Sequence, residues 1–306
     1  MKNDSFLQRC LPFIAYFNIC FFWGTANIAN KLSSSVLHPF LAGSVRFSIA
    51  SGLMALWIIG RRISFKITRH EAKILITSGC IMYFIHTLLL LFSSRRVEAG
   101  ISTAMVCLIP ISILLVDSLV SRRLNIGWIG MTGIVGGLSG TLIIVSHSLA
   151  QGGSDPLGLL LLLASDFIWA AGTIYLKYNV IHPPLQVQIF YQAAVPAVLY
   201  LLTTAFTGNL GAFKKLTLPS ILPMTYMAVA DSIIGFTSYV YLIRKWKTSV
   251  VSTYAYINPV VGLLMSTLIL SEKLTAFKVC GMLIILASVF IIQNEDSLHR
   301  LLAKSK

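Results

Sequence analysis

A few charged side chains lie inside long apolar stretches of this 306-residue chain. Arg46 is about eight residues into one stretch, and Asp166 and Asp231 lie within two others. An arginine at the centre of a bilayer costs on the order of 2.5–3.5 kcal/mol, so Arg46 needs a carboxylate partner, backbone carbonyls or an anionic group on a substrate. Its fork of donors suits a carboxylate or a phosphate. We interpret Arg46 either as a substrate-binding residue or as a structural arginine that ties helices together.

The acids of the apolar stretches suggest different roles. Asp166 and Asp231 are in positions where a charged carboxylate is costly, so either could carry a proton, and Asp231 could instead partner a basic residue. Asp117 lies near the end of its stretch, close to Arg122 and the arginine after it, which favours an ion pair at the membrane surface. His86 is a candidate for a hydrogen bond in a pocket or for a titrating group, against the simpler interpretation of a satisfied buried histidine.

A tryptophan and a lysine recur at the same spacing. Phe21-Phe22-Trp23, seven residues and Lys31 return 146 residues later as Phe167-Ile168-Trp169, seven residues and Lys177. Side chains at intervals of three and four share one helix face. The two faces are Cys20, Trp23, Asn27 and Lys31, and Asp166, Trp169, Thr173 and Lys177. Polar stripes on apolar helices face a bundle interior or a cavity, so they predict a central pocket; the alternative is an interfacial tryptophan and a lysine snorkelling to the headgroups.

Prolines, tyrosines and glycines add weaker signals. Pro110 and Pro259 occupy matching positions in two stretches, and because proline frees a helix carbonyl, both helices should bend there, as hinges or only as packing features. Tyrosines of the second half could line a cavity, although most would be packing or interface residues: Tyr191, Tyr239, Tyr254 and Tyr256. Two overlapping GxxxG patterns, 133–137 and 136–140, favour close helix packing within the monomer or in a homodimer.

These signals give two groups of candidate residues. The substrate-binding candidates are Trp23, Asn27, Arg46, His86, Trp169, Thr173, Tyr191 and Tyr239. The candidates for gating or coupling, for example to protons, are Lys31, Asp166, Lys177 and Asp231. A pocket of Trp, Tyr, Asn and Arg suits a small polar or zwitterionic substrate such as an amino acid. The excess of basic groups keeps open an anionic or nucleotide-like metabolite.

The elements that must position these residues are membrane-spanning helices. Hydrophobic residues make up 56% of the chain and charged residues 11%, with a mean hydropathy of +0.82. A soluble protein keeps roughly a quarter of its residues charged. Ten mostly apolar stretches approach the ~20 residues that cross a lipid bilayer: 11–30, 38–60, 72–93, 100–120, 126–146, 157–177, 184–205, 220–243, 249–269 and 276–293.

This pattern predicts an all-α membrane protein with ten transmembrane helices. The duplicated helix divides them into two five-helix repeats, 11–146 and 157–293. Because an odd number of crossings reverses orientation, the repeats should be inverted, with the binding site between them near the bilayer midplane.

Lys and Arg are unevenly divided between the two sides of this bundle. The side of the termini carries sixteen and the other side seven, which places both termini in the cytoplasm and the chain in the plasma (inner) membrane. The net charge of +14 is thus a topology signal, and nucleic-acid binding is not expected. The five cysteines have no metal or redox spacing, so we expect neither a metal nor a cofactor.

Over about 11–293 the chain resembles the drug/metabolite transporter superfamily, in particular proteins with two EamA domains. The residues that carry the resemblance are Trp23-Gly24, Lys31, Pro39 with Arg46, Pro110, Trp169, Lys177, Pro259 and Leu270-Ser271-Glu272-Lys273-Leu274. The resemblance implies a ten-helix carrier for small metabolites, often an exporter of amino acids or related compounds.

The two halves depart from each other at two places. The first half has Val120-Ser121-Arg122-Arg123-Leu124 where the family usually carries a turn like that around Glu272, and the second half has Tyr191 where Arg46 would map. The halves have therefore specialised. Roles at one of these positions do not transfer to the other.

Three other classes of protein compete with a carrier. Gly137-Leu138-Ser139-Gly140 looks like the nucleophile motif of rhomboid proteases, but no later span offers a histidine base at a suitable depth, so an enzyme is not expected. A channel should show rings of one charge or a carbonyl filter, and neither is evident. A membrane scaffold would not require a buried arginine or duplicated polar stripes.

Overall fold

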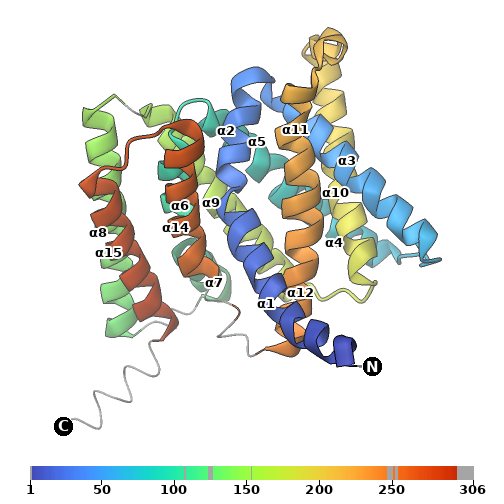
Figure 1. Cartoon of the computed structure of the whole chain (residues 1–306), viewed down its shortest axis with the longest axis horizontal. Helices are drawn as coiled ribbons and strands as arrows, with labels where there is room; N and C mark the ends of the chain where they lie inside the picture. The colour runs from blue at the N-terminus through green and yellow to red at the C-terminus, as the bar shows by residue number, and fades with distance from the viewer. Residues whose placement is uncertain are drawn as a thin grey trace.

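The computed structural model describes residues 2–106, 108–122, 127–152, 154–246, 251 and 254–294, and every regular element in these ranges is a helix (Figure 1). Arg123 and Leu124, in the turn noted above, lie outside the described residues, as does the side chain of Tyr256. The first-half helices are α1 (Lys2–Gly24), α2 (Ala26–Val36), α3 (Pro39–Gly60), α4 (Arg69–Ser78), η1 (Gly79–Ile85), α5 (His86–Ser94), α6 (Ala99–Val106), α7 (Ile109–Ser121) and α8 (Trp128–Ala150). The second-half helices are α9 (Pro156–Tyr178), α10 (Leu185–Phe206), η2 (Asn209–Lys215), α11 (Leu218–Tyr226), η3 (Met227–Gly235), α12 (Phe236–Lys245), α14 (Tyr254–Leu270) and α15 (Ala276–Gln293).

Within the part of the chain that the structure describes, seven helical runs are long and apolar enough to cross a membrane, and the pair α6 and α7, inclined to each other by 42°, would make eight. The seven are Cys10–Val36, Pro39–Gly60, Arg69–Ser94, Trp128–Ala150, Pro156–Tyr178, Leu185–Phe206 and Leu218–Tyr239. Two shorter apolar helices, Ile257–Leu270 and Ala276–Ile292, lie in the last two expected spans. The predicted all-helical class with several spans is confirmed. The count of ten and the inversion of the repeats stay predictions.

The outer surface is apolar and the interior holds polar groups, as expected of a bundle surrounded by lipid. Phe206 and Leu119 have exposed fractions of 87% and 78%, whereas many serine and threonine side chains are buried. Interhelical hydrogen bonds satisfy several of these groups: the Ser44 and Thr204 hydroxyls lie 3.1 Å apart, and Tyr200 donates to the Phe84 carbonyl at 2.9 Å. Such bonds, rather than hydrophobic burial, hold helices together in lipid.

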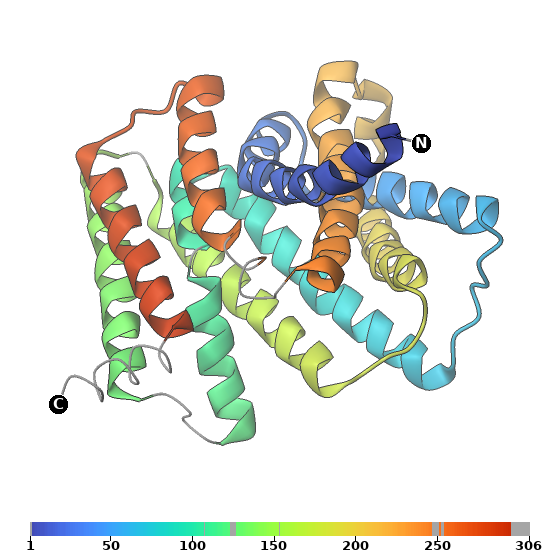
Figure 2. The same ribbon diagram turned by 60° about the horizontal axis from the view of Figure 1, so that its bottom comes forward.

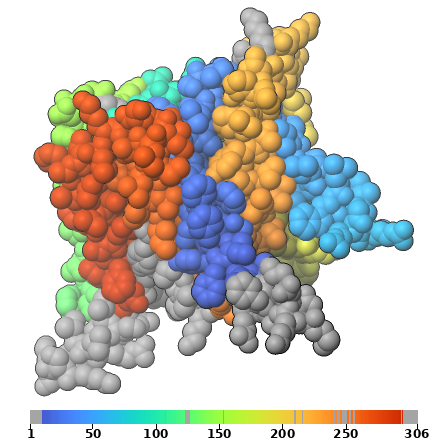
Figure 3. Space-filling model, in the orientation of Figure 1, coloured from blue at the N-terminus to red at the C-terminus, as the bar shows by residue number. Residues whose placement is uncertain are grey.

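The packing joins the first half of the chain to the second throughout. α3 packs against α10, α8 against α15 and α6 against α14, while α1 packs against η3 and α12, and α9 against η1 and α5. By their order in the two halves, α1 corresponds to α9, α3 to α10, η1 to η3, α5 to α12, α6 to α14 and α8 to α15. Exchanging every helix for its counterpart therefore gives the same set of packed pairs. α8 and α15 lie side by side in both ribbon views (Figures 1 and 2), and α1 and α2 lie between α14 and α11–α12 on the face in Figure 3.

Two spans contain a π-helix at corresponding places. η1 interrupts the third expected span between α4 and α5, and η3 interrupts the eighth between α11 and α12. π-helical turns inside α-helices are rare and are frequent at functional sites. Both of these spans carry polar residues, and Tyr83 and Asp231 lie within the π-helices. The two π-helices therefore mark the region in which to look for a site.

The glycines of α8 let it approach α15 closely, so the GxxxG patterns serve packing within the monomer. A Cβ atom on Gly281 would lie 2.7 Å from the Gly140 carbonyl oxygen, and one on Gly140 would lie 2.7 Å from the Gly281 carbonyl oxygen. We expect Gly281→Leu to destabilise the protein by about 1–3 kcal/mol, since neither backbone can yield. Thermal unfolding in detergent measures this as a lower Tm. Gly52→Leu, at a glycine with open space around it, is the matched control and should leave Tm unchanged; an equal Tm for both variants would contradict the close approach.

Candidate functional site

Arg46 and Asp231 form a buried ion pair between the two halves of the chain. The Arg46 Nη2 donates to the Asp231 Oδ2 at 2.8 Å and reaches the Ser232 hydroxyl at 3.5 Å. The side chains are 7% and 20% exposed. Among the described residues, the Nε of Arg46 has no hydrogen-bond partner. The carboxylate that Arg46 requires is therefore Asp231 of η3, and the guanidinium keeps an unused donor.

Trp23 lies beside this pair and reaches into the other half of the chain. Its indole N–H donates to the Asp231 carbonyl at 3.3 Å, and its ring packs against Tyr239 and Tyr254 at centroid distances of 5.5 and 5.0 Å. A Cβ atom on Gly235 would meet the indole nitrogen at 2.5 Å, so a glycine here is what lets Trp23 approach η3. Trp23 stands at the end of α1, next to the break at Thr25.

Trp169 occupies the corresponding place against η1 and α5. Its ring packs on His86 at 5.0 Å and on Tyr83 at 6.2 Å. The His86 Nδ1 lies 2.9 Å from the Ser165 carbonyl oxygen, which fixes the orientation of the imidazole. Each tryptophan of the duplicated motif thus packs against the π-helical span of the opposite half.

A chain of contacts connects the two tryptophans. Arg46 lies over the Phe47 ring at 5.0 Å, and Phe47 packs on Tyr83 at 6.1 Å. We call the set formed by Trp23, Tyr83, His86, Trp169 and the Arg46–Asp231 pair the central cluster. All of its members except Arg46 are partly exposed, although they lie within the bundle. The cluster offers one cation, one anion and several aromatic faces.

Asp166 is buried beside the central cluster without joining its hydrogen bonds. Its side chain is completely inaccessible, and among the described residues neither carboxylate oxygen has a hydrogen-bond partner. It adjoins Ser165 and lies one helical turn before Trp169 on α9.

The two lysines of the duplicated motif lie near opposite ends of the bundle. Lys177 pairs with Asp117 at 2.7 Å and is 53% exposed, so among the described residues the ion-pair partner of Asp117 is this lysine and not the Arg122 expected from the sequence; Arg123 lies outside the described residues. The sequence did not predict the Lys177–Asp117 pair, because α7 and α9 become neighbours only when the chain folds. Lys31 donates to the Val97 carbonyl at 2.7 Å. We refer to the Lys31 end and the Lys177 end of the bundle.

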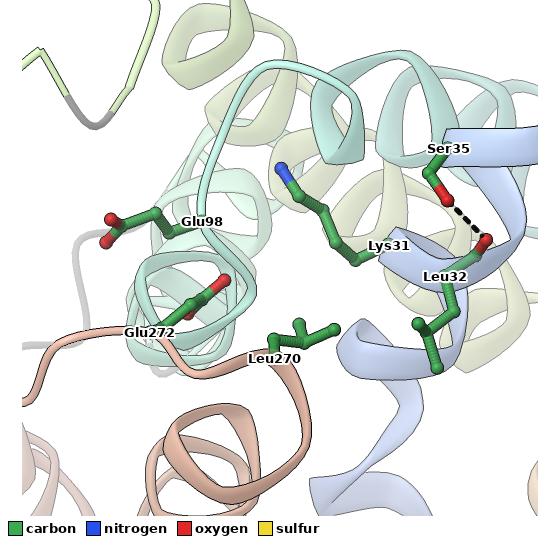
Figure 4. A pocket seen from close by; sticks show the side chains of 6 residues that line it. All are labelled: Lys31, Leu32, Ser35, Glu98, Leu270 and Glu272. Carbon is green, nitrogen blue, oxygen red and sulfur yellow. Dashed lines mark hydrogen bonds between the residues drawn. The ribbon is translucent and has the colours of Figure 1, made fainter.

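The Lys31 end holds a pocket of about 350 Å³. It is lined by Lys31, Leu32, Ser35, Glu98, Leu270 and Glu272, and Figure 4 shows the lysine and the two carboxylates on opposite sides of it. The Glu272 carboxylate accepts from the backbone N–H groups of Ala99 and Gly100 at 2.7 and 2.9 Å. It thereby binds the positive end of α6, whose first N–H groups have no helical partner.

Two further ion pairs join segments of the two halves at the same end. Lys278 pairs with Glu98, and Arg96 pairs with Asp155. The Arg96 guanidinium, helped by the Leu157 backbone N–H, holds the pKa of the Asp155 carboxyl below its ordinary value. Charged contacts thus join the two halves of the chain at the Lys31 end.

Some predicted residues lie apart from the central cluster. Tyr191 donates to the Phe65 carbonyl at 3.0 Å, Thr173 donates to the Trp169 carbonyl of its own helix, and the Asn27 amide reaches the Thr103 hydroxyl at 3.4 Å. Tyr239 joins the cluster through Trp23. Pro110 is the second residue of α7, at the bend from α6, and Pro259 lies inside α14.

Tyr83 and Glu272 are among the residues that the structure brings into these sites and that sequence reasoning missed. Tyr83 lies one turn before His86 and shares its helix face, which was a usable signal. Glu272 was noted only as part of a turn, and nothing in the sequence pointed to α6 as its partner. Ser139, the nucleophile of the protease-like motif, donates to the Val135 carbonyl and is exposed.

Known proteins similar to this chain are membrane transporters. The uncharacterized inner membrane transporter YedA of Escherichia coli is 25% identical over 291 residues, covering 93% of this chain and 92% of that protein. An uncharacterized transporter of Archaeoglobus fulgidus is 26% identical over 280 residues, covering 90% and 95%. A probable amino-acid metabolite efflux pump of Escherichia coli is 26% identical over 168 residues, covering 53% of this chain and 56% of the pump.

The fold and the family agree with these relatives. A crystal structure with 15% sequence identity superposes with a TM-score of 0.64, covering 91% of this chain and 94% of that one, and so shares the fold. The EamA-like transporter family matches the chain twice, over residues 12–146 and 156–293. The chain therefore belongs to the EamA-like transporter family.

Proposed function

We propose that the protein is a secondary carrier that exports amino acids or closely related zwitterionic metabolites by alternating access. The observation that carries this proposal is the buried Arg46–Asp231 pair, placed between the two halves and flanked by their equivalent tryptophans. An efflux pump for amino-acid metabolites among the relatives supports the substrate class.

The charges of the central cluster match a zwitterion. A substrate carboxylate would bind the guanidinium fork of Arg46, including its free Nε, and a substrate ammonium would bind the Asp231 carboxylate. Arg46 and Asp231 neutralise each other in their pair, so exchange of partners with the substrate keeps every buried charge paired. The faces of Trp23, Tyr83 and Trp169 would contact the rest of the substrate. An anionic metabolite would leave Asp231 unpaired, so the structure favours the zwitterion over the nucleotide-like alternative.

The carrier would use ten spans in two inverted repeats, with both termini in the cytoplasm. The two short apolar helices complete the count, and the interchangeable packing of the halves supports the symmetry. With this topology the Lys31 end faces outward and the Lys177 end inward. Closure at the Lys31 end and opening at the other would expose the central cluster to the cytoplasm, and the reverse would release the substrate outside. Pro110 and Pro259 are our candidates for the hinges.

Metabolite profiling of cells and medium tests this function. We expect cells that express the protein to lose an amino acid or a derivative from the interior and to gain it in the medium. Arg46→Gln and Trp169→Ala should abolish the change. The matched controls are Arg61→Gln and Trp128→Ala, an exposed arginine at the end of α3 and a tryptophan that is 64% exposed, and both should export as the wild type does.

Other results would change the assignment. Accumulation inside the cells would reverse the direction to uptake. No change in any metabolite, with the protein correctly folded in the membrane, would contradict a carrier and favour a scaffold.

A further inference from the structure

Asp166 differs from every other acid whose side chain the structure describes. The other six each have a polar partner: Glu71 with the Thr68 N–H, Glu98 with Lys278, Asp117 with Lys177, Asp155 with Arg96, Asp231 with Arg46, and Glu272 with the α6 N–H groups. Asp166 has none for either oxygen and is completely buried. Native proteins rarely leave a buried polar group unsatisfied, so such a group needs an explanation.

The position of Asp166 is central in the bundle. It is eleven residues from Asp155 at one end of α9 and eleven from Lys177 at the other. At 1.5 Å per residue each end is about 16 Å away along the helix. Neither terminal ion pair can therefore compensate a charge on Asp166.

The helices packed against α9 also offer Asp166 no cation at this depth. They are α4, η1, α5, α6 and α7. Their charged or titratable side chains are Arg69, His70, Glu71 and Lys73 on α4, Cys80 and Tyr83 on η1, His86 on α5, none on α6 and Asp117 on α7. The basic residues of α4 belong to the first two turns of that helix, at the Lys177 end, and the Nδ1 of His86 is held by the Ser165 carbonyl.

An ionised carboxylate in this place would be uncompensated, at a cost of several kcal/mol. A neutral carboxylic acid removes most of that cost. We propose that Asp166 is a proton-binding site: it holds a proton in the present conformation and releases it to water when the transport cycle opens α9 to one side of the membrane. On release, the carboxyl O–H bond breaks, the proton passes to water as hydronium, and water solvates the carboxylate that remains.

The site is well placed to couple proton release to the central cluster. Ser165, the neighbour of Asp166, holds His86, and Trp169 lies one turn further on the same helix. Hydration of Asp166 therefore requires movement of the helix that carries one wall of the proposed substrate site. This coupling rests on the proposed carrier function, whereas the protonation of Asp166 does not.

Infrared spectroscopy of the protein in lipid tests the protonation directly. At about pH 7, where a free aspartic acid is ionised, we expect one carboxylic-acid carbonyl band that is absent in Asp166→Asn and shifted in Asp166→Glu. Asp117→Asn, which removes an acid already ionised in its pair with Lys177, should keep the band. A wild-type spectrum without the band, or a band that survives Asp166→Asn, would overturn the proposal. A carboxylate band that moves on addition of Na⁺ would make it a cation site and overturn the proposal as well.

Vesicles loaded with a mixture of radiolabelled amino acids test the coupling. For one proton per substrate, a gradient of about one pH unit can sustain up to about a tenfold concentration ratio. We expect the wild type to build this ratio, and Asp166→Asn to lose it while still exchanging labelled for unlabelled amino acids at equal pH. If the wild type exchanges but ignores the pH gradient, the coupling is wrong. If it does not exchange at all, the proposed substrate class is wrong, and the infrared band still decides the protonation.

Discussion

Arg46→Gln is expected to reduce transport of an amino-acid substrate by at least about 100-fold. The guanidinium can give a substrate carboxylate two charge-assisted hydrogen bonds, each of about 1.5–3 kcal/mol. The amide of glutamine offers neither the charge nor the fork. Loss of about 3 kcal/mol in binding the substrate corresponds to more than a hundredfold. Exchange of radiolabelled amino acids in vesicles measures the effect.

The same substitution also leaves Asp231 unpaired inside the bundle, so loss of stability must be separated from loss of binding. Breaking a buried pair by removing one partner costs about 3–5 kcal/mol. The double variant Arg46→Gln/Asp231→Asn removes both charges and should recover the Tm of the wild type, yet it should not transport. Recovery of transport together with Tm would show that Arg46 is only a tie between α3 and η3. Arg61→Gln is the matched control, and both its Tm and its transport rate should equal those of the wild type.

Glu272→Gln is expected to open the Lys31 end. The carboxylate binds two N–H groups at the start of α6 and so joins the turn after α14 to the helix after α5. An amide can accept only through its oxygen, and its NH₂ group would face an N–H donor. Loss of one charge-assisted bond, about 1.5–3 kcal/mol, shifts the equilibrium between closed and open states by at least about tenfold.

Labelling of a single cysteine at Ser34, which is completely buried one turn after Lys31, measures this opening. With the five native cysteines replaced, a membrane-impermeant maleimide should react at least about ten times faster in Glu272→Gln than in its parent, by the same shift. Glu71→Gln is the matched control, because the Glu71 carboxylate also accepts a backbone N–H at a helix start, that of Thr68, but lies at the Lys177 end. Equal labelling in all three proteins would contradict a latch at Glu272.

The amino-acid sequence predicted the helices better than the contacts between them. Apolar runs gave the spans closely, for example 38–60 against the observed Pro39–Gly60, because lipid imposes both composition and length. The π-helices η1 and η3 were not predicted. Both lie in expected spans that carry polar residues.

The need for partners was also predictable, but their identities were not. The depth of Arg46 required a compensating group, and that of Asp231 favoured either a proton or a basic partner, yet 185 residues separate the two and no local rule joins such a pair. Tyr191 shows the opposite case. It occupies the place of Arg46 in the second repeat, but it bonds to the Phe65 carbonyl near the start of α4, away from the central cluster.

The exchange of tryptophans between the halves has a consequence for biosynthesis. Trp23 lodges against a π-helix made some 200 residues later, and Trp169 enters one made long before it. When the first half of the chain leaves the ribosome, Trp23 therefore lacks the π-helix against which it packs, and the first half's own π-helix lacks Trp169. The first half must wait in the membrane as an incomplete unit until the second half arrives, and each half then completes the other.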